Sequence, residues 1–223
     1  ILSSVHLPES FNVVDMGAGK GYLTFALYDY LHNKLKKKPK VLGIELRSEL
    51  VEKCNAIVEK AKFDDLSFEQ GTIKDAILPK IDVLMALHAC DTATDDAIAR
   101  GVRDQAKVIL AAPCCHKQVR NSMKNQGSLA PLTKFGIMEA RQAEILTDTI
   151  RALILESHGY KTKVFEFIAT DHTPKNILIA AVKTKEISVP DPIIRAQITT
   201  LKETFGIAFH ELERLLEIKT LNH

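Results

Sequence analysis

The chain has 223 residues, of which 46% are hydrophobic and 26% are charged, values that are ordinary for a globular protein. These proportions exclude a disordered chain, a collagen and a coiled coil, and no apolar run approaches the roughly 18 residues that a membrane span needs. Lys and Arg number 30 against 28 Asp and Glu, giving a formal net charge of +2. That charge is too small to indicate a nucleic-acid partner by itself.

The spacing of the four cysteines indicates the redox environment of the protein. Cys54, Cys90, Cys114 and Cys115 lack the spacing of a disulfide framework or of paired zinc-ribbon knuckles. We therefore expect a reducing, cytoplasmic environment. The opening residues also lack the charged and apolar regions of a secretory signal.

Apolar runs alternate with helical patterns through the first part of the chain. Residues 11–16 predict a strand, residues 20–36 a helix, residues 40–46 a second strand and residues 49–63 a second helix. Such alternation predicts a parallel sheet with right-handed crossovers. Later elements are predicted as strands at 66–69, 81–87 and 106–112 and as a long helix at 138–158, which Gly159 ends.

The last two strand patterns, residues 161–169 and 176–183, are separated by only six residues. Because six residues cannot hold a crossover helix, this pair must be antiparallel. A mostly parallel α/β sheet with a terminal antiparallel hairpin resembles the Rossmann-like sheet of class I methyltransferases, whereas dinucleotide-binding dehydrogenases keep a parallel sheet. We expect residues 1–185 to form this domain. Residues 186–223 should add a C-terminal helical extension packed on it, with helices at 193–205 and 208–218.

A glycine-rich turn stands where the first strand meets its helix. It reads Asp15-x-Gly17-x-Gly19-x-Gly21, and its glycines allow close backbone approach to a ligand at a helix N-terminus. The spacing fits neither GxGxxG nor a P-loop, so a diphosphate cofactor is not expected. Taken alone, the motif also fits a glycine turn that binds nothing.

Two further segments strengthen the cofactor interpretation. Glu45 ends the second strand, where an acid can accept the hydroxyls of a ribose. Gly71, Thr72 and Ile73 follow the third strand and are placed to contact an adenine. In class I methyltransferases the glycine turn holds the aminoacyl end of S-adenosylmethionine. The predicted cofactor residues are Asp15, Gly17, Gly19, Gly21, Glu45, Gly71, Thr72, Ile73 and Leu87.

Two motifs follow the next pair of strands. His88 to Asp95 reads H-x-C-x-x-A-T-D, and Cys114 to His116 reads C-C-H. Together with DxGxGxGYLT they resemble a methyltransferase-domain family that includes eukaryotic tRNA acceptor-stem 2′-O-methyltransferases and bacterial relatives of unassigned substrate. The resemblance covers about residues 11–183 and implies S-adenosylmethionine as cofactor. Asp91 and Lys117 stand where the tRNA enzymes carry glycine and a second histidine.

The same two strand ends should bring candidate catalytic residues to one rim: His88, Asp91, Cys114 and His116. Methyl transfer from a sulfonium is an in-line displacement, and His88, Asp91 or His116 can take the proton of the acceptor, with His116 or Asp91 favoured. A nucleophilic Cys114 thiolate, as in pyrimidine C5-methyltransferases, is one alternative. Zinc on the Cys and His side chains is another. Because adjacent cysteines seldom both reach one tetrahedral ion, no metal is expected.

The segment after the fifth strand indicates the substrate. Residues 117–138 contain no acid and carry Lys117, Arg120, Lys124 and Lys134, which suits contacts with RNA phosphates. Asn176 opens the last strand and is a further candidate substrate contact. A second basic run, at residues 34–40, should lie at the opposite edge of the sheet as a solvated turn.

Some alternatives stay open. No motif for reading DNA sequence is found, and no oligomeric state is indicated. A methyltransferase for a small molecule or protein remains a second function class, and a non-catalytic cofactor-binding scaffold a third.

Overall fold

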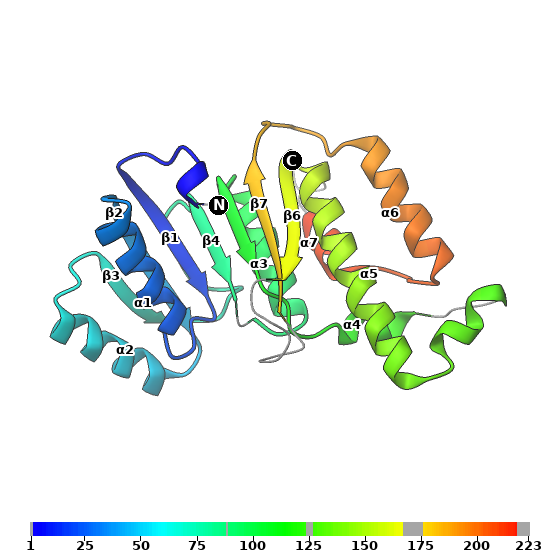
Figure 1. Cartoon of the computed structure of the whole chain (residues 1–223), viewed down its shortest axis with the longest axis horizontal. Coiled ribbons are helices and arrows are strands. Elements are labelled where there is room, and N and C mark those ends of the chain that lie inside the picture. The colour runs from blue at the N-terminus through cyan, green and yellow to red at the C-terminus, as the bar shows by residue number, and fades with distance from the viewer. Residues whose placement is uncertain (1, 88, 124–126, 167–175, 218–223) are drawn as a thin grey trace.

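The computed structural model describes residues 2–87, 89–123, 127–166 and 176–217. Its strands form one seven-stranded sheet (Figure 1). They are β1 (Ser10–Met16), β2 (Lys38–Glu45), β3 (Leu66–Gln70), β4 (Val83–Ala86), β5 (Val108–Ala111), β6 (Tyr160–Glu166) and β7 (Ile177–Lys183). The spatial order is β3-β2-β1-β4-β5-β7-β6. Strands β1 to β5 are parallel, and β7 lies antiparallel to both β5 and β6. The predicted class I methyltransferase fold is confirmed.

The helices connect and cover these strands. They are α1 (Tyr22–Asp29), α2 (Ser48–Ala61), α3 (Thr92–Arg103), α4 (Lys117–Ser122), α5 (Gly136–Ser157), α6 (Pro192–Thr204) and α7 (Glu211–Glu217), with short 3₁₀ turns at Leu2–Ser4 and Gly127–Thr133. The helix predicted for residues 20–36 begins later, because Gly21 has φ +73°. It ends in a π-helical turn, Tyr30–Lys34. Helix α3 was not predicted, because its residues were interpreted as part of the rim.

Alternate residues of the central strands face two different helical layers. Val13, Val83 and Val108 belong to an apolar cluster that also contains residues of α1 and α2. Their neighbours Val14, Leu84 and Ile109 belong to a second cluster with residues of α3, α5, α6 and α7. All six are fully buried, and each such burial contributes about 1.5–3 kcal/mol. Burial on both faces explains the continuous apolar runs in the sequence.

The C-terminal helices pack on the second of these layers. Helix α6 lies against α5, and α7 lies against α3. Leu212 of α7 is fully buried and shares the apolar cluster of β4 and β5. Figure 1 shows α1 and α2 beside β1, β2 and β3, and α5 and α6 at the other end of the sheet. Within the described residues, no helix combines the length and the apolar character that a membrane span requires.

Parallel pairing positions the candidate site. The carboxyl ends of β1 to β5 lie at one edge, so the turns that follow them gather there. The lysine-rich turn lies at the opposite edge, because Lys38 is the first residue of β2. Lys38 forms an exposed ion pair there with Glu9.

Candidate functional site

The glycine turn after β1 is held against the end of β2. The N–H groups of Gly17 and Ala18 both donate to the Ile44 carbonyl, at 2.9 Å. Gly17 and Gly19 have φ +78° and +60°, where a side chain is strained. A Cβ on either residue would meet no atom nearer than about 3.9 Å, so the space beside the turn is open. Gly21 differs, since its Cβ would collide with Phe25, Phe68 and Cys54.

A hollow of about 440 Å³ opens beside this turn, within the size range of small-molecule sites. Six of the predicted cofactor residues line it: Gly17, Gly19, Glu45, Gly71, Thr72 and Ile73. Gly21 does not line the hollow. It lies against Phe25, Phe68 and Cys54 below the turn, where a Cβ would have no room. Leu87 is half-buried against the apolar cluster of α1 and α2. Arg47, Lys74 and Asp96 also line the hollow and were not predicted.

Glu45 is 7% exposed and orders the floor of the hollow. Its Oε2 accepts the Gly19 N–H at 2.9 Å, and its Oε1 accepts the backbone N–H and the Nε–H of Arg47 at 3.1 and 2.8 Å. Burial would raise the pKa of Glu45, but these hydrogen bonds and the Arg47 charge hold it below its usual value. The carboxylate is therefore ionised, and Oε2 keeps an acceptor position for a hydroxyl group.

Asp15 lies below the glycine turn, at the end of β1. It is 3% exposed, and its Oδ2 accepts the Thr24 hydroxyl at 2.6 Å. Burial raises the pKa of Asp15 to about 6, although the bond from Thr24 opposes this. At neutral pH the carboxylate supplies a buried negative charge close to the turn.

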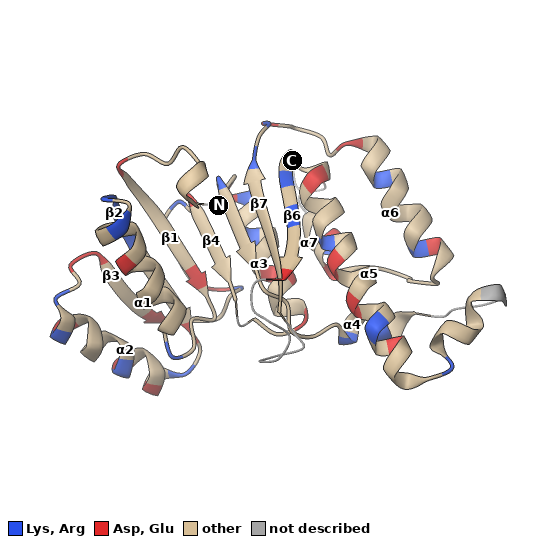
Figure 2. Cartoon of the chain, viewed as in Figure 1, with Lys and Arg blue, Asp and Glu red and all other residues tan. Residues whose placement is uncertain are grey.

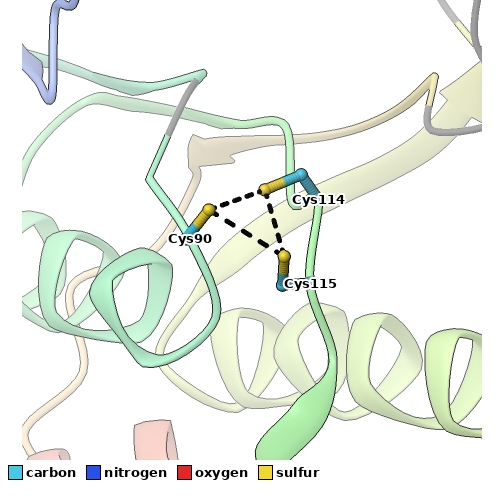
Figure 3. A group of neighbouring side chains, drawn as sticks. All are labelled: Cys90, Cys114 and Cys115. Atoms are coloured by element: carbon cyan, nitrogen blue, oxygen red, sulfur yellow. Dashed lines mark hydrogen bonds between the residues drawn. The ribbon is translucent and has the colours of Figure 1, made fainter.

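The predicted rim forms where β4 and β5 end side by side. Ala86 pairs with Ala111, so β4 and β5 end at the same level of the sheet. Three sulfur atoms meet there (Figure 3). Cys90 Sγ lies 3.3 Å from Cys114 Sγ and 3.9 Å from Cys115 Sγ, and the two adjacent cysteines have their sulfurs 3.7 Å apart. Although adjacent cysteines seldom both reach one tetrahedral ion, the sulfurs of Cys114 and Cys115 both lie within 4 Å of Cys90 Sγ.

The pKa of Cys114 bears on the thiolate alternative. Burial and the hydrogen bonds with the neighbouring thiols raise it to about 12. With all three thiols reduced, Cys114 is therefore protonated at neutral pH. This disfavours the nucleophilic thiolate that a pyrimidine C5-methyltransferase mechanism requires.

His116 is joined to a buried ionic network on the long helix. Its Nε2 lies 3.1 Å from Asp148 Oδ2 of α5, and the carboxylate can only accept, so the proton is on Nε2 and Nδ1 is the basic nitrogen. Asp148 in turn accepts from Arg151 Nη1 at 3.1 Å. Arg151 is fully buried and also donates to both carboxylate oxygens of Asp95, at 2.8 and 3.0 Å. The network holds the His116 ring in one orientation, in the way that a carboxylate holds the histidine of a catalytic triad.

Asp91 precedes α3 with φ +50° and ψ −119°, a region that glycine enters far more readily than other residues. The Asp91 carbonyl accepts from Arg151 Nη2 at 3.0 Å, and its Oδ1 accepts from the Gln118 N–H at 3.4 Å. The strained backbone is thus held by the network around Arg151.

The predicted substrate residues are in different environments. Lys117 is exposed at the start of α4. Arg120 is exposed, but Glu139 offsets its charge at 2.9 Å. Asn176 is 2% exposed, which leaves little of it for contact with a large substrate. His88 and Lys124 lie outside the described residues. Figure 2 shows basic positions on α4 and on the segment that leads to α5.

Sequence reasoning missed Asp95 as an ion-pair partner and missed Asp148 and Arg151 altogether. The predicted site residues follow strand ends, whereas these residues lie on α3 and α5. A signal was present, because Arg151 lies in the buried stripe of the helix that also contains Thr147, Ile154 and Leu155. A charged residue in such a stripe needs a buried partner.

Comparisons with known proteins identify the family of the chain. The sequence model of the family described as "Methyltransferase domain" matches residues 2–122. No curated protein sequence matches the chain. Solved structures that resemble it include an S-adenosyl-L-methionine-dependent methyltransferase, described as putative, from Methanococcus maripaludis, with 11% identity, a TM-score of 0.48 and coverage of 81% of this chain and 80% of that one. Precorrin-6y C5,15-methyltransferase from Geobacter metallireducens has 16% identity, a TM-score of 0.46 and coverage of 82% and 85%.

Proposed function

The chain belongs to the methyltransferase-domain family, and we propose that it methylates RNA with S-adenosylmethionine as the methyl donor. Family and fold give the activity and the cofactor. The acceptor is the part that we infer. The exposed basic side chains that follow the rim on α4 and before α5 carry this inference.

The residues of the hollow fit the cofactor. Gly17 and Gly19 leave open space beside the turn, and Glu45 keeps an acceptor position for a ribose hydroxyl. Asp15 places a negative charge near the predicted position of the aminoacyl group. When bound, S-adenosylmethionine supplies an electrophilic methyl group on a sulfonium. The protein must then align an acceptor atom with that methyl group and remove the acceptor's proton.

His116 is the group best arranged to take that proton. Asp148 holds its ring through Nε2, so Nδ1 is the nitrogen that can accept. The imidazolium formed would be stabilised by the Asp148 carboxylate, because opposite charges lie in contact in a largely buried site. We assign His116 as general base and Asp148 as the residue that orients it.

Lys117, Lys134 and Phe135 support an RNA acceptor. All three are exposed on the segment that begins next to His116. Lys134 Nζ lies 5.6 Å from the centre of the Phe135 ring. Lysines suit phosphate contacts, and an exposed aromatic ring suits stacking on an unpaired base.

The test is transfer of a labelled methyl group from S-adenosylmethionine to total cellular RNA, to the protein fraction and to the small-molecule fraction. Label in RNA supports the proposal, whereas label confined to protein or small molecules overturns it. The double variant Lys117→Gln/Lys134→Gln should weaken RNA binding and lower the slope of log K against log salt by up to about 2. Lys34→Gln/Lys40→Gln, at the opposite edge of the sheet, is the matched control and should leave the slope unchanged.

A further inference from the structure

We propose that Cys90, Cys114 and Cys115 bind a Zn²⁺ ion whose fourth position, for which the described residues add no ligand to this group, takes a ligand from outside the protein. The sulfur atoms of these three cysteines, which come from two separate loops, lie close together. Their separations are 3.3, 3.7 and 3.9 Å. Zinc bound tetrahedrally by sulfurs at about 2.3 Å has those sulfurs about 3.8 Å apart. The three atoms therefore form a triangle close to one face of a zinc tetrahedron (Figure 3).

The backbone holds this triangle in place. The Ala112 N–H donates to the Ala86 carbonyl at 3.0 Å, which ties the two loops together just before the cysteines. The Thr94 hydroxyl donates to the Ala89 carbonyl at 2.7 Å, and the Ala93 N–H donates to the Cys90 carbonyl at 3.0 Å. Cys90 is thereby fixed at the N-terminal end of α3, where the helix dipole favours a negative sulfur.

A third sulfur distinguishes a metal site from a disulfide. A disulfide would use two of the cysteines and leave the third unexplained, although all three sulfurs lie within 4 Å of one another. Thiolates are soft ligands that zinc binds well. Cys90 is exposed and the other two are half-buried, so an ion can enter from solvent. Binding balances as one Zn²⁺ gained and three thiol protons released.

The position of the ion indicates a catalytic rather than a structural zinc site. Cys90 also lines the cofactor hollow, so the ion would lie at the rim beside that hollow. Zinc sites with three protein ligands and one open position are typically catalytic, because the ion lowers the pKa of the group that takes the fourth position. The site would take an oxygen, nitrogen or sulfur atom of an acceptor. Zinc binding itself does not rest on the proposal that this acceptor is RNA.

The first experiment measures zinc directly. The full chain is purified with a non-thiol reductant, stripped with a chelator, given Zn²⁺ and desalted, and its metal content is determined by mass spectrometry. We expect about one zinc per chain, with three protons released on binding. No retained zinc would overturn the proposal, as would a disulfide between two of the three cysteines in protein isolated without air.

Variants then assign the ligands. Cys90→Ser, Cys114→Ser and Cys115→Ser should each raise the zinc Kd at least about 100-fold in competition with a coloured chelator, since even changes to groups behind the ligands cost up to this amount. Cys54→Ala, which removes a cysteine buried in the α2 layer, is the matched control and should leave the Kd unchanged. A Kd that the three serine variants do not change would overturn the proposal.

A cobalt experiment on the wild-type chain tests the site even if a serine variant fails to fold. Co²⁺ added to the stripped wild-type chain should show the sulfur-to-metal absorption and the visible bands of a tetrahedral thiolate site. A spectrum without sulfur-to-cobalt absorption would overturn the proposal. Since these measurements need neither cofactor nor RNA, their failure is separate from failure of the proposed function.

Discussion

Glu45 shows how one side chain can both build a site and remain able to bind. Its carboxylate ties the glycine turn to the residue after β2 through Gly19 and Arg47. The same bonds keep it ionised in spite of its burial. Because the oxygen that accepts from Gly19 retains a lone pair, a cofactor hydroxyl can bind without displacing the turn.

Glu45→Gln should weaken cofactor binding. The substitution removes the charge, and its amide cannot accept on both oxygen positions, so charge-assisted hydrogen bonds worth about 1.5–3 kcal/mol are lost. We expect the Kd of S-adenosylmethionine to rise about 10- to 100-fold in calorimetry. Glu49→Gln, at an exposed position at the start of α2, should not change it. Equal affinity of the two variants would contradict the ribose assignment.

At the scale of an element, α7 depends on a buried neutral histidine. His210 precedes α7 and is fully buried, and its Nδ1 accepts the Leu212 N–H at 3.2 Å. Burial, together with the nearby Arg151 charge, lowers the pKa of His210 to about 3. Protonation would break the bond to Leu212 and place a second cation beside Arg151.

The pH dependence of stability follows from that pKa. The folded-state pKa is below the unfolded value of about 6.5, so the stability that His210 contributes is present above pH 6.5 and is lost as the pH falls toward 3. Relative to His210→Asn, which keeps an acceptor for the Leu212 N–H, the wild type should lose about 2 kcal/mol of unfolding free energy between pH 7 and pH 5. Urea unfolding of both proteins at the two pH values measures this. A difference that does not vary with pH would rule out His210 as the titrating group.

At the scale of the whole molecule, Arg151 joins parts that are distant in sequence. From α5 it donates to Asp95 of α3, to the Asp91 carbonyl before α3, and to Asp148, which holds His116. Burial raises the pKa of Asp95 even though Arg151 opposes this. The Asp95 carboxylate therefore depends on the guanidinium to stay charged in the core.

Arg151→Met should be strongly destabilising. It leaves Asp95 and Asp148 buried without their cation, so we expect a loss of about 3–5 kcal/mol in unfolding free energy. The matched control is Arg141→Met on the same helix, where an exposed ion pair with Glu144 should be worth less than about 1 kcal/mol. Urea unfolding of both variants at pH 7 decides the point. A loss near 1 kcal/mol for Arg151→Met would mean that the network contributes little.

The sequence was sufficient for the order of the elements and for most of the cofactor site. Apolar strands alternating with helices imply a parallel sheet, and the six residues between the last two strand patterns imply the antiparallel pair. Because the ends of parallel strands share one edge, Gly17, Glu45 and Thr72 could be placed together from their positions in the chain. Helix ends were less predictable, since the left-handed conformation of Gly21 delays the start of α1 and the helix ends in a π turn.

Only the tertiary structure decided which side chains of the rim meet. The meeting of the sulfurs of Cys90, Cys114 and Cys115 depends on the register of β4 against β5 and on the local backbone, neither of which shows in residue spacing. Arg151 of α5 is paired with Asp95 of α3, which lies 56 residues away in the sequence. Local sequence patterns report periodicity and turns, whereas contacts between distant elements arise only when the whole sheet and its layers are assembled.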